Sequence, residues 1–90
     1  MFYVYVLESQ KNDSLYIGST SDLQRRLKEH NQGLSTSTNR YVPWKLIYYE
    51  ASLNHADAIR REKWLKSTHG RRMLKLRIRE YMYGKGQQTE

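Results

Sequence analysis

The 90-residue sequence contains no cysteine and no long apolar run. The absence of cysteine excludes disulfide bonds and thiolate metal sites, and the three histidines lack the spacing of a zinc finger. No apolar segment approaches the roughly 20 residues of a membrane span, and residues 1–7 are too short and lack the basic flank of a signal peptide. We therefore expect one small cytoplasmic domain, with no zinc ion and no membrane partner.

Positive charge is in excess, with 16 Lys and Arg against 9 Asp and Glu and a net charge of +7. Residues 60–85 hold ten basic and two acidic side chains, so this stretch alone carries +8 and the rest of the chain is close to neutral. Such a surface can simply keep a protein in solution. Its clustering favours contact with a nucleic-acid backbone, although charge does not distinguish DNA from RNA.

Three segments have the composition of β-strands. Residues 2–8 and 15–20 are rich in β-branched and aromatic side chains, and the polar residues 10–14 between them predict a hairpin turn. Strand periodicity makes both faces of the first segment apolar or aromatic, which is typical of a central strand. Residues 44–50, which follow Pro43, form the third expected strand.

Helices are expected in the remaining segments. Residues 20–22 supply N-cap chemistry for a helix that carries Leu23, Leu27 and Leu34 and ends near Gly33. Asn54 caps a second helix through about residue 67, and Gly70 separates it from a third over residues 71–83. The alternation in residues 74–79 also fits a strand, and residues 84–90 are expected to be a disordered tail.

These elements predict an α+β fold. The order is β-β-α-β-α-α, with a short three-stranded antiparallel sheet flanked by helices, and residues 1–83 form the single domain.

Two basic residues lie beside the apolar stripe of the first helix. At about 100° per residue, Arg26 and His30 fall next to Leu23 and Leu27. Burying such groups is costly unless an anion meets them. The alternative is that both side chains extend to solvent at the border of the helix.

An acidic residue lies within the apolar face of the second helix. Glu62 falls between Ala58, Ile59 and Leu65. An ion pair with Lys66 one turn later would contribute only roughly 0.2–0.5 kcal/mol, which is small against the cost of burying a charge. A bound cation is the sharper explanation, and oxygen ligation suits Mg²⁺ or Mn²⁺.

These residues together resemble the GIY-YIG nucleases. The similarity runs in consistent order from residue 2 to residue 66 and is closest to small stand-alone bacterial members of the YhbQ type. It rests on residues 3–5 and 16–18, Arg26, His30 and Glu62. The resemblance implies a small sheet flanked by helices that cuts phosphodiester bonds with one divalent metal ion, so residues 1–83 would be a catalytic domain.

The resemblance also implies catalytic roles for five residues: Tyr5, Tyr16, Arg26, His30 and Glu62. Glu62 would bind the metal, one Mg²⁺ or Mn²⁺ ion. Tyr16 is the expected base and Tyr5 a positioning or proton-shuttling group, if both hydroxyls reach one water or phosphate oxygen. Arg26 would neutralise charge on the phosphate, and His30 would donate to the phosphate or move a proton.

Several features depart from the pattern of the family. Tyr3 replaces the glycine of the family name. Ser19 stands where UvrC-like members carry a lysine, which removes one possible phosphate contact. Family members are often joined to a separate DNA-binding module, and this sequence shows none, so substrate choice must come from the domain's own surface, a partner or a dimer.

Residues outside the catalytic set are candidates for contact with the nucleic-acid backbone. The polar loop after the first helix contributes Thr38 and Arg40, although such a segment is more often simply a loop. Trp64 is expected to pack under the third helix or to stack on a base. The remaining candidates lie in the basic C-terminal region: Lys66, Arg71, Arg72, Lys75 and Arg79.

Three functions follow from these observations. The first is a metal-dependent DNA endonuclease, acting on a branched, nicked or distorted structure in DNA repair or processing, as a monomer or weak homodimer. The second is a non-catalytic nucleic-acid-binding module with the same fold, for which RNA is not excluded. The third is a basic adaptor for an acidic protein. A glutamate in the apolar face argues against the last two, because binding alone does not need it.

Overall fold

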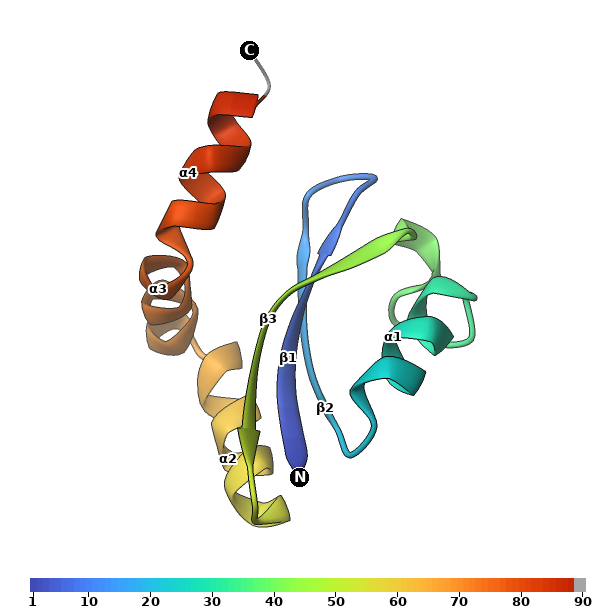
Figure 1. Ribbon diagram of the computed structural model, residues 1–90, viewed down its shortest axis with the longest axis vertical. Helices are drawn as coiled ribbons and strands as arrows, with labels where there is room; N and C mark the ends of the chain where they lie inside the picture. The colour runs from blue at the N-terminus through green and yellow to red at the C-terminus, as the bar shows by residue number, and fades with distance from the viewer. Residues whose placement is uncertain (89–90) are drawn as a thin grey trace.

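A computed structural model describes residues 1–88 and contains one three-stranded antiparallel sheet with helices on both faces (Figure 1). The predicted α+β class is confirmed. The elements in chain order are β1 (Phe2–Ser9), β2 (Leu15–Thr20), α1 (Leu23–Asn31), the short 3-10 helix η1 (Asn39–Tyr41), β3 (Trp44–Ser52), α2 (His55–Lys66), α3 (Thr68–Arg77) and α4 (Arg79–Gln88).

The central strand of the sheet is β1, as its two apolar faces predict. The strand order is β2-β1-β3, and both neighbours run antiparallel to β1. The turn between β1 and β2 closes through a hydrogen bond from the Ser9 amide to the Ser14 carbonyl, and Asp13 adopts a φ of 65° within it. Because β2 lies at the edge, side chains from both layers of helices can meet around it.

The two faces of the sheet support separate hydrophobic cores. Val4 and Val6 of β1 pack with Ile17 of β2 against α2 and α3. On the opposite face, Tyr5 and Leu7 pack with Trp44 against α1 and the loop that follows it. Figure 1 shows α1 on one side of the sheet and α2 and α3 on the other. Strand periodicity therefore sorts alternate residues of β1 between two different environments.

Side-chain caps define the helix starts. Asp22 accepts a hydrogen bond from the Arg25 amide and Asn54 accepts one from the Ala56 amide, as expected. The predicted boundary at Gly70 is wrong, because Ser67 caps α3 and Gly70 lies inside that helix. A Cβ atom at Gly70 would lie 1.9 Å from the Trp64 carbonyl oxygen, so this glycine permits close packing of α3 on α2. Leu34 is also outside the apolar stripe, since α1 ends at Asn31 and Leu34 is exposed.

The C-terminal region differs from the prediction of one helix and a disordered tail. The chain is helical to Gln88, with α3 and α4 separated at Ile78, and the alternating residues 74–79 form no strand. The break allows Ile78 to be buried beside Leu74. Lys85 pairs with Glu8, which anchors part of the expected tail, while residues 89–90 lie outside the described part of the chain. No helix in residues 1–88 is long and apolar enough to span a membrane.

Candidate active site

The centre of the α1 face is occupied by Tyr5. Its ring lies over Gly18, its register partner on β2, where a Cβ atom would come within 2.6 Å of the Tyr5 hydroxyl oxygen. Tyr16 projects from the same face of β2, and its ring centroid lies 6.3 Å from that of Tyr5. The two tyrosines therefore share one face of the sheet, and glycine at position 18 leaves space for their rings.

A chain of hydrogen bonds runs from Tyr5 into the loop after α1. The Tyr5 hydroxyl is 2.8 Å from His30 Nε2, and His30 Nδ1 is 2.7 Å from the Thr38 hydroxyl. All three side chains are buried, and His30 and Thr38 are fully enclosed. Both ring nitrogens of His30 are engaged within the protein, so this arrangement allows His30 to hold Tyr5 and exchange a proton with it, and contact with a phosphate stays a prediction.

Thr38, the other candidate for phosphate contact in this region, is fully buried. Its hydroxyl is used by His30, and its carbonyl accepts a hydrogen bond of 2.9 Å from the indole nitrogen of Trp44. Asn31 fixes the end of α1 by bonding the backbone amide and carbonyl of Trp44. These support roles were missed because polar residues in a Ser/Thr-rich loop give no sequence signal of burial. Arg40 remains exposed beside this loop.

Arg26 brings positive charge to the tyrosines. Its guanidinium donates a 3.0 Å hydrogen bond to Glu29, and its side chain is one-third exposed. Hydrogen bonding to Glu29 raises the pKa of Arg26, although burial opposes the shift, and Tyr5 and Tyr16 add to the increase. The arginine is consequently held in place while part of it stays open to a ligand.

Burial controls protonation in this cluster. Loss of solvation raises the pKa of Tyr5 to about 12, although hydrogen bonding and charge from Arg26 oppose the shift. Burial, with the nearby Arg26 charge, lowers the pKa of His30 below its usual value. At neutral pH Tyr5 therefore keeps its proton and His30 is uncharged, which suits both residues to positioning.

Glu62 approaches from α2, on the other side of the sheet. One carboxylate oxygen accepts a 2.6 Å hydrogen bond from Ser19 on the edge strand β2, and the other accepts one of 2.7 Å from Lys66. Burial would raise the pKa of Glu62, but the bonds from Lys66 and Ser19 outweigh it and lower the pKa. Glu62 is thus ionised at neutral pH, and its charge reaches Tyr5 around the edge of the sheet. The partner role of Ser19 had no signal in the sequence.

The residues around Glu62 fit a divalent metal ion with one protein ligand. Within residues 1–88 no three His, Asp or Glu side chains gather into a metal-binding group. A single ionised carboxylate nevertheless fits Mg²⁺, which is usually bound by one or two carboxylates together with substrate phosphates and keeps several water ligands. Lys66 is 46% exposed and pairs with Glu62 one helical turn away, an interaction worth only about 0.3–0.5 kcal/mol that a divalent cation can replace.

The basic residues lie mostly away from the tyrosines. Lys66 reaches the site through Glu62. The other candidates are exposed on α3 and α4, away from the face that carries the tyrosines: Arg71, Arg72, Lys75 and Arg79. Trp64 packs edge-on against His69 of α3, with the Arg61 guanidinium 4.7 Å from its ring centroid, so it lies under the third helix as expected.

Comparisons with known proteins agree with this arrangement. Residues 1–77 match the GIY-YIG catalytic domain. The chain is 39% identical over 77 residues to UPF0213 protein CPE1444 of Clostridium perfringens, covering 84% of this chain and 82% of that protein. It is 38% identical over 66 residues to UPF0213 protein HQ_3675A of Haloquadratum walsbyi, covering 72% and 73%.

A solved structure shows the same fold. The solution NMR structure of UPF0213 protein BH0048 from Bacillus halodurans superimposes with a TM-score of 0.51 at 33% identity, covering 82% of each chain.

Proposed function

Because this chain belongs to the GIY-YIG family of nucleases, we propose that it is a divalent-metal-dependent endonuclease that hydrolyses DNA phosphodiester bonds. The observation that carries the proposal is the buried hydrogen-bond chain from Tyr5 to His30 beside the ring of Tyr16, with the carboxylate of Glu62 held by Ser19 on the neighbouring strand β2. A buried hydrogen-bond chain, an arginine and an ionised carboxylate are the groups that phosphate hydrolysis needs.

The residues divide the chemistry among them. Tyr16 is less buried than Tyr5 and is the proposed base for the attacking water. Tyr5 keeps its proton and, held by His30, positions Tyr16 and the phosphate. Arg26 offsets the negative charge that develops on the phosphate oxygens as the new P–O bond forms and the old one breaks.

Glu62 is the proposed ligand for one Mg²⁺ or Mn²⁺ ion. A bound divalent cation supplies Lewis-acid stabilisation of phosphate charge. Ser19 orients the carboxylate by its short hydrogen bond to one oxygen. The Lys66 ammonium bonds the other oxygen, and it would be free to contact a phosphate if a cation took its place on Glu62. Contact with the DNA backbone is proposed for five exposed basic residues: Arg40, Arg71, Arg72, Lys75 and Arg79. The proposed role is cytoplasmic, in DNA repair or processing, with the protein acting as a monomer or weak homodimer.

The test is cleavage of labelled duplex, single-stranded, nicked and branched DNA in Mg²⁺, Mn²⁺ or EDTA by the wild type and Glu62→Gln. We expect metal-dependent products from the wild type and a loss of at least about 100-fold in Glu62→Gln, because its metal ligand is gone. The matched control is Glu80→Gln, which alters an exposed carboxylate on α4 and should cleave as the wild type does. Full cleavage by Glu62→Gln would contradict the proposal.

One observation favours a second candidate, a non-catalytic nucleic-acid-binding module. Both oxygens of Glu62 already have protein partners, Ser19 and Lys66, so the carboxylate has a structural role without a metal. This candidate predicts salt-sensitive DNA binding and no product in any metal ion.

A further inference from the structure

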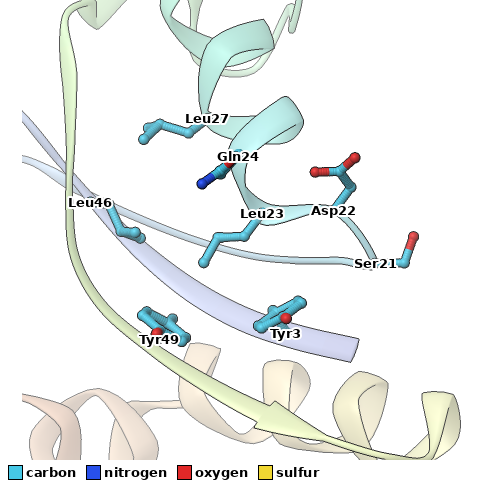
Figure 2. A pocket seen from close by; sticks show the side chains of 8 residues that line it. All are labelled: Tyr3, Ser21, Asp22, Leu23, Gln24, Leu27, Leu46 and Tyr49. Atoms are coloured by element: carbon cyan, nitrogen blue, oxygen red, sulfur yellow. The ribbon is translucent and has the colours of Figure 1, made fainter. Parts of the chain in front are cut away.

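A cavity of about 480 Å³ lies on the α1 face of the sheet, beside the tyrosine cluster (Figure 2). Tyr3 of β1 and Tyr49 of β3 form one wall, and Leu23 and Leu27 of α1 form the opposite one. None of the residues proposed for catalysis lines it. The cavity therefore needs an explanation separate from the chemistry of Tyr5 and Glu62.

The lining suits a flat aromatic ligand with polar edges. The rings of Tyr3 and Tyr49 lie 6.0 Å apart at 64°, and Tyr49 is 54% exposed although it is one of the largest side chains. Leu23 and Leu46 provide apolar surface. Gln24 points toward the space between these walls in Figure 2, and its amide group can both donate and accept hydrogen bonds. Exposed aromatic rings beside an apolar wall are a stacking platform for bases.

The cavity is next to the proposed site of cleavage. Tyr3 precedes Tyr5 by two residues on the same face of β1, a separation of about 7 Å along a strand. Tyr49 is the register partner of Tyr5 on β3. A base in the cavity would thus hold its own strand against the tyrosine and arginine cluster, and the net charge of +7 favours a polyanionic strand as the carrier of that base.

We propose that this cavity binds one unpaired nucleobase, stacked on the exposed ring of Tyr49 with Tyr3 at its edge. A paired base is enclosed by its neighbours in the duplex, whereas a bulged, flapped or mismatched base leaves the stack at little cost. The cavity thereby selects DNA with an unpaired base next to the cleaved bond. That the bound base belongs to DNA rests on the proposed nuclease function. The cavity itself explains why DNA with an unpaired base would be preferred to fully paired DNA.

The test measures DNA binding in EDTA, where no strand is cut. Three end-labelled duplexes are compared: fully paired, with one bulged base, and with the same bulge carrying an abasic sugar. We expect the wild type to bind the bulged base about 10-fold more tightly than either other duplex, as stacking of one base provides. The preference should vanish in Tyr49→Ala and persist in Tyr49→Phe, which keeps the ring. The matched control is Tyr83→Ala, the same change at an exposed tyrosine of α4, which should keep the preference.

Equal binding of the bulged base and the abasic bulge by the wild type would overturn the base site, as would a preference that survives in Tyr49→Ala. Absence of binding to all three duplexes would overturn it too. The wild-type comparison does not depend on any variant folding. Failure of the nuclease proposal is distinguishable, because the base preference would then remain in EDTA while Mg²⁺ and Mn²⁺ yield no product.

Discussion

Tyr5 shows how one residue can depend on the absence of a side chain opposite it. Its hydroxyl reaches His30 because Gly18 presents only backbone beneath the ring. Burial then raises the pKa of Tyr5 to about 12, which keeps the proton that the hydrogen bond to His30 requires. The glycine is needed for space, and no unusual backbone angle is involved.

Substitution of Gly18 by alanine should therefore destabilise the site. A Cβ atom there meets Tyr5 at 2.6 and 2.7 Å, and the Tyr5 ring is too enclosed to move freely. We expect Gly18→Ala to lower the free energy of unfolding by about 1–3 kcal/mol, measured by urea denaturation.

The matched control is Gly84→Ala, because a Cβ atom at Gly84 meets nothing within 4 Å. That variant should be as stable as the wild type or up to about 1 kcal/mol more stable, since alanine favours helix. Equal stability of Gly18→Ala and the wild type would show that Tyr5 is not confined in this way.

At the level of elements, α4 is attached to the sheet by a polar contact. Glu8 of β1 is 1% exposed and accepts 2.6 Å hydrogen bonds from both Tyr81 and Lys85 of α4. Lys85 also bonds Asp13 in the β1–β2 turn at 2.8 Å. Burial would raise the pKa of Glu8, but the bonds from Lys85 and Tyr81 outweigh it and lower the pKa. The docking of α4 therefore requires Glu8 to be ionised.

This contact predicts a loss of stability in acid. Folding lowers the pKa of the Glu8 carboxylate from its unfolded value of about 4.5. The carboxylate therefore stabilises the protein fully when the pH is above that unfolded pKa, and the stabilisation is lost as the pH falls through the folded pKa. Glu8→Gln should be less stable than the wild type at pH 7 by about 1.5–3 kcal/mol. It should then lose less stability than the wild type below pH 4.5.

Thermal unfolding from pH 7 to pH 3 measures this difference. Glu80→Gln, an exposed change on the same helix, should stay within about 0.5 kcal/mol of the wild type at pH 7. Parallel stability curves for Glu8→Gln and the wild type across the acid range would refute the role of Glu8.

At the scale of the whole molecule, the sheet separates two kinds of surface. The tyrosine cluster and the base cavity face α1, whereas most of the positive charge lies on α2, α3 and α4. Glu62 and Lys66 lie on the α2 side and contact the edge strand β2 through Ser19. A nucleic-acid strand that contacted both surfaces would have to pass this edge, so the proposed backbone contacts and the proposed base site would be spatially separate.

The salt dependence of DNA binding should identify the residues that contact phosphates. The logarithm of the binding constant for duplex DNA falls linearly with the logarithm of the salt concentration. Each phosphate contact adds about 0.9 to the steepness of this line. If Arg72 contacts a phosphate, Arg72→Gln should reduce the slope by about 0.9. Lys11→Gln removes the same charge in the β1–β2 turn and should leave the slope unchanged, as measured by fluorescence anisotropy at several salt concentrations. Equal slopes for Arg72→Gln and the wild type would remove Arg72 from the interface.

Local patterns were enough for most of the fold. The alternating apolar residues of β1 predicted a central strand, and Asp22 and Asn54 predicted two helix starts, because capping and periodicity act over a few neighbouring residues. The same patterns misplaced the third helix at Gly70. Gly70 does not interrupt the helix. It allows α3 to pack closely against Trp64 of the preceding helix.

The sequence alone determined the α+β order and the excess of positive charge. It left open whether Tyr5 and Tyr16 face the same side of the sheet, which the fold decided. Tertiary structure alone decided that Thr38 is buried behind His30, that Ser19 orients Glu62, and that α4 docks on Glu8. Periodicity and capping are local, whereas each of these contacts joins residues that chain folding brings together, and the hydrogen bond between Tyr81 and Glu8 spans 73 positions. A polar residue is satisfied by whichever partner the fold supplies, and residue type does not specify that partner.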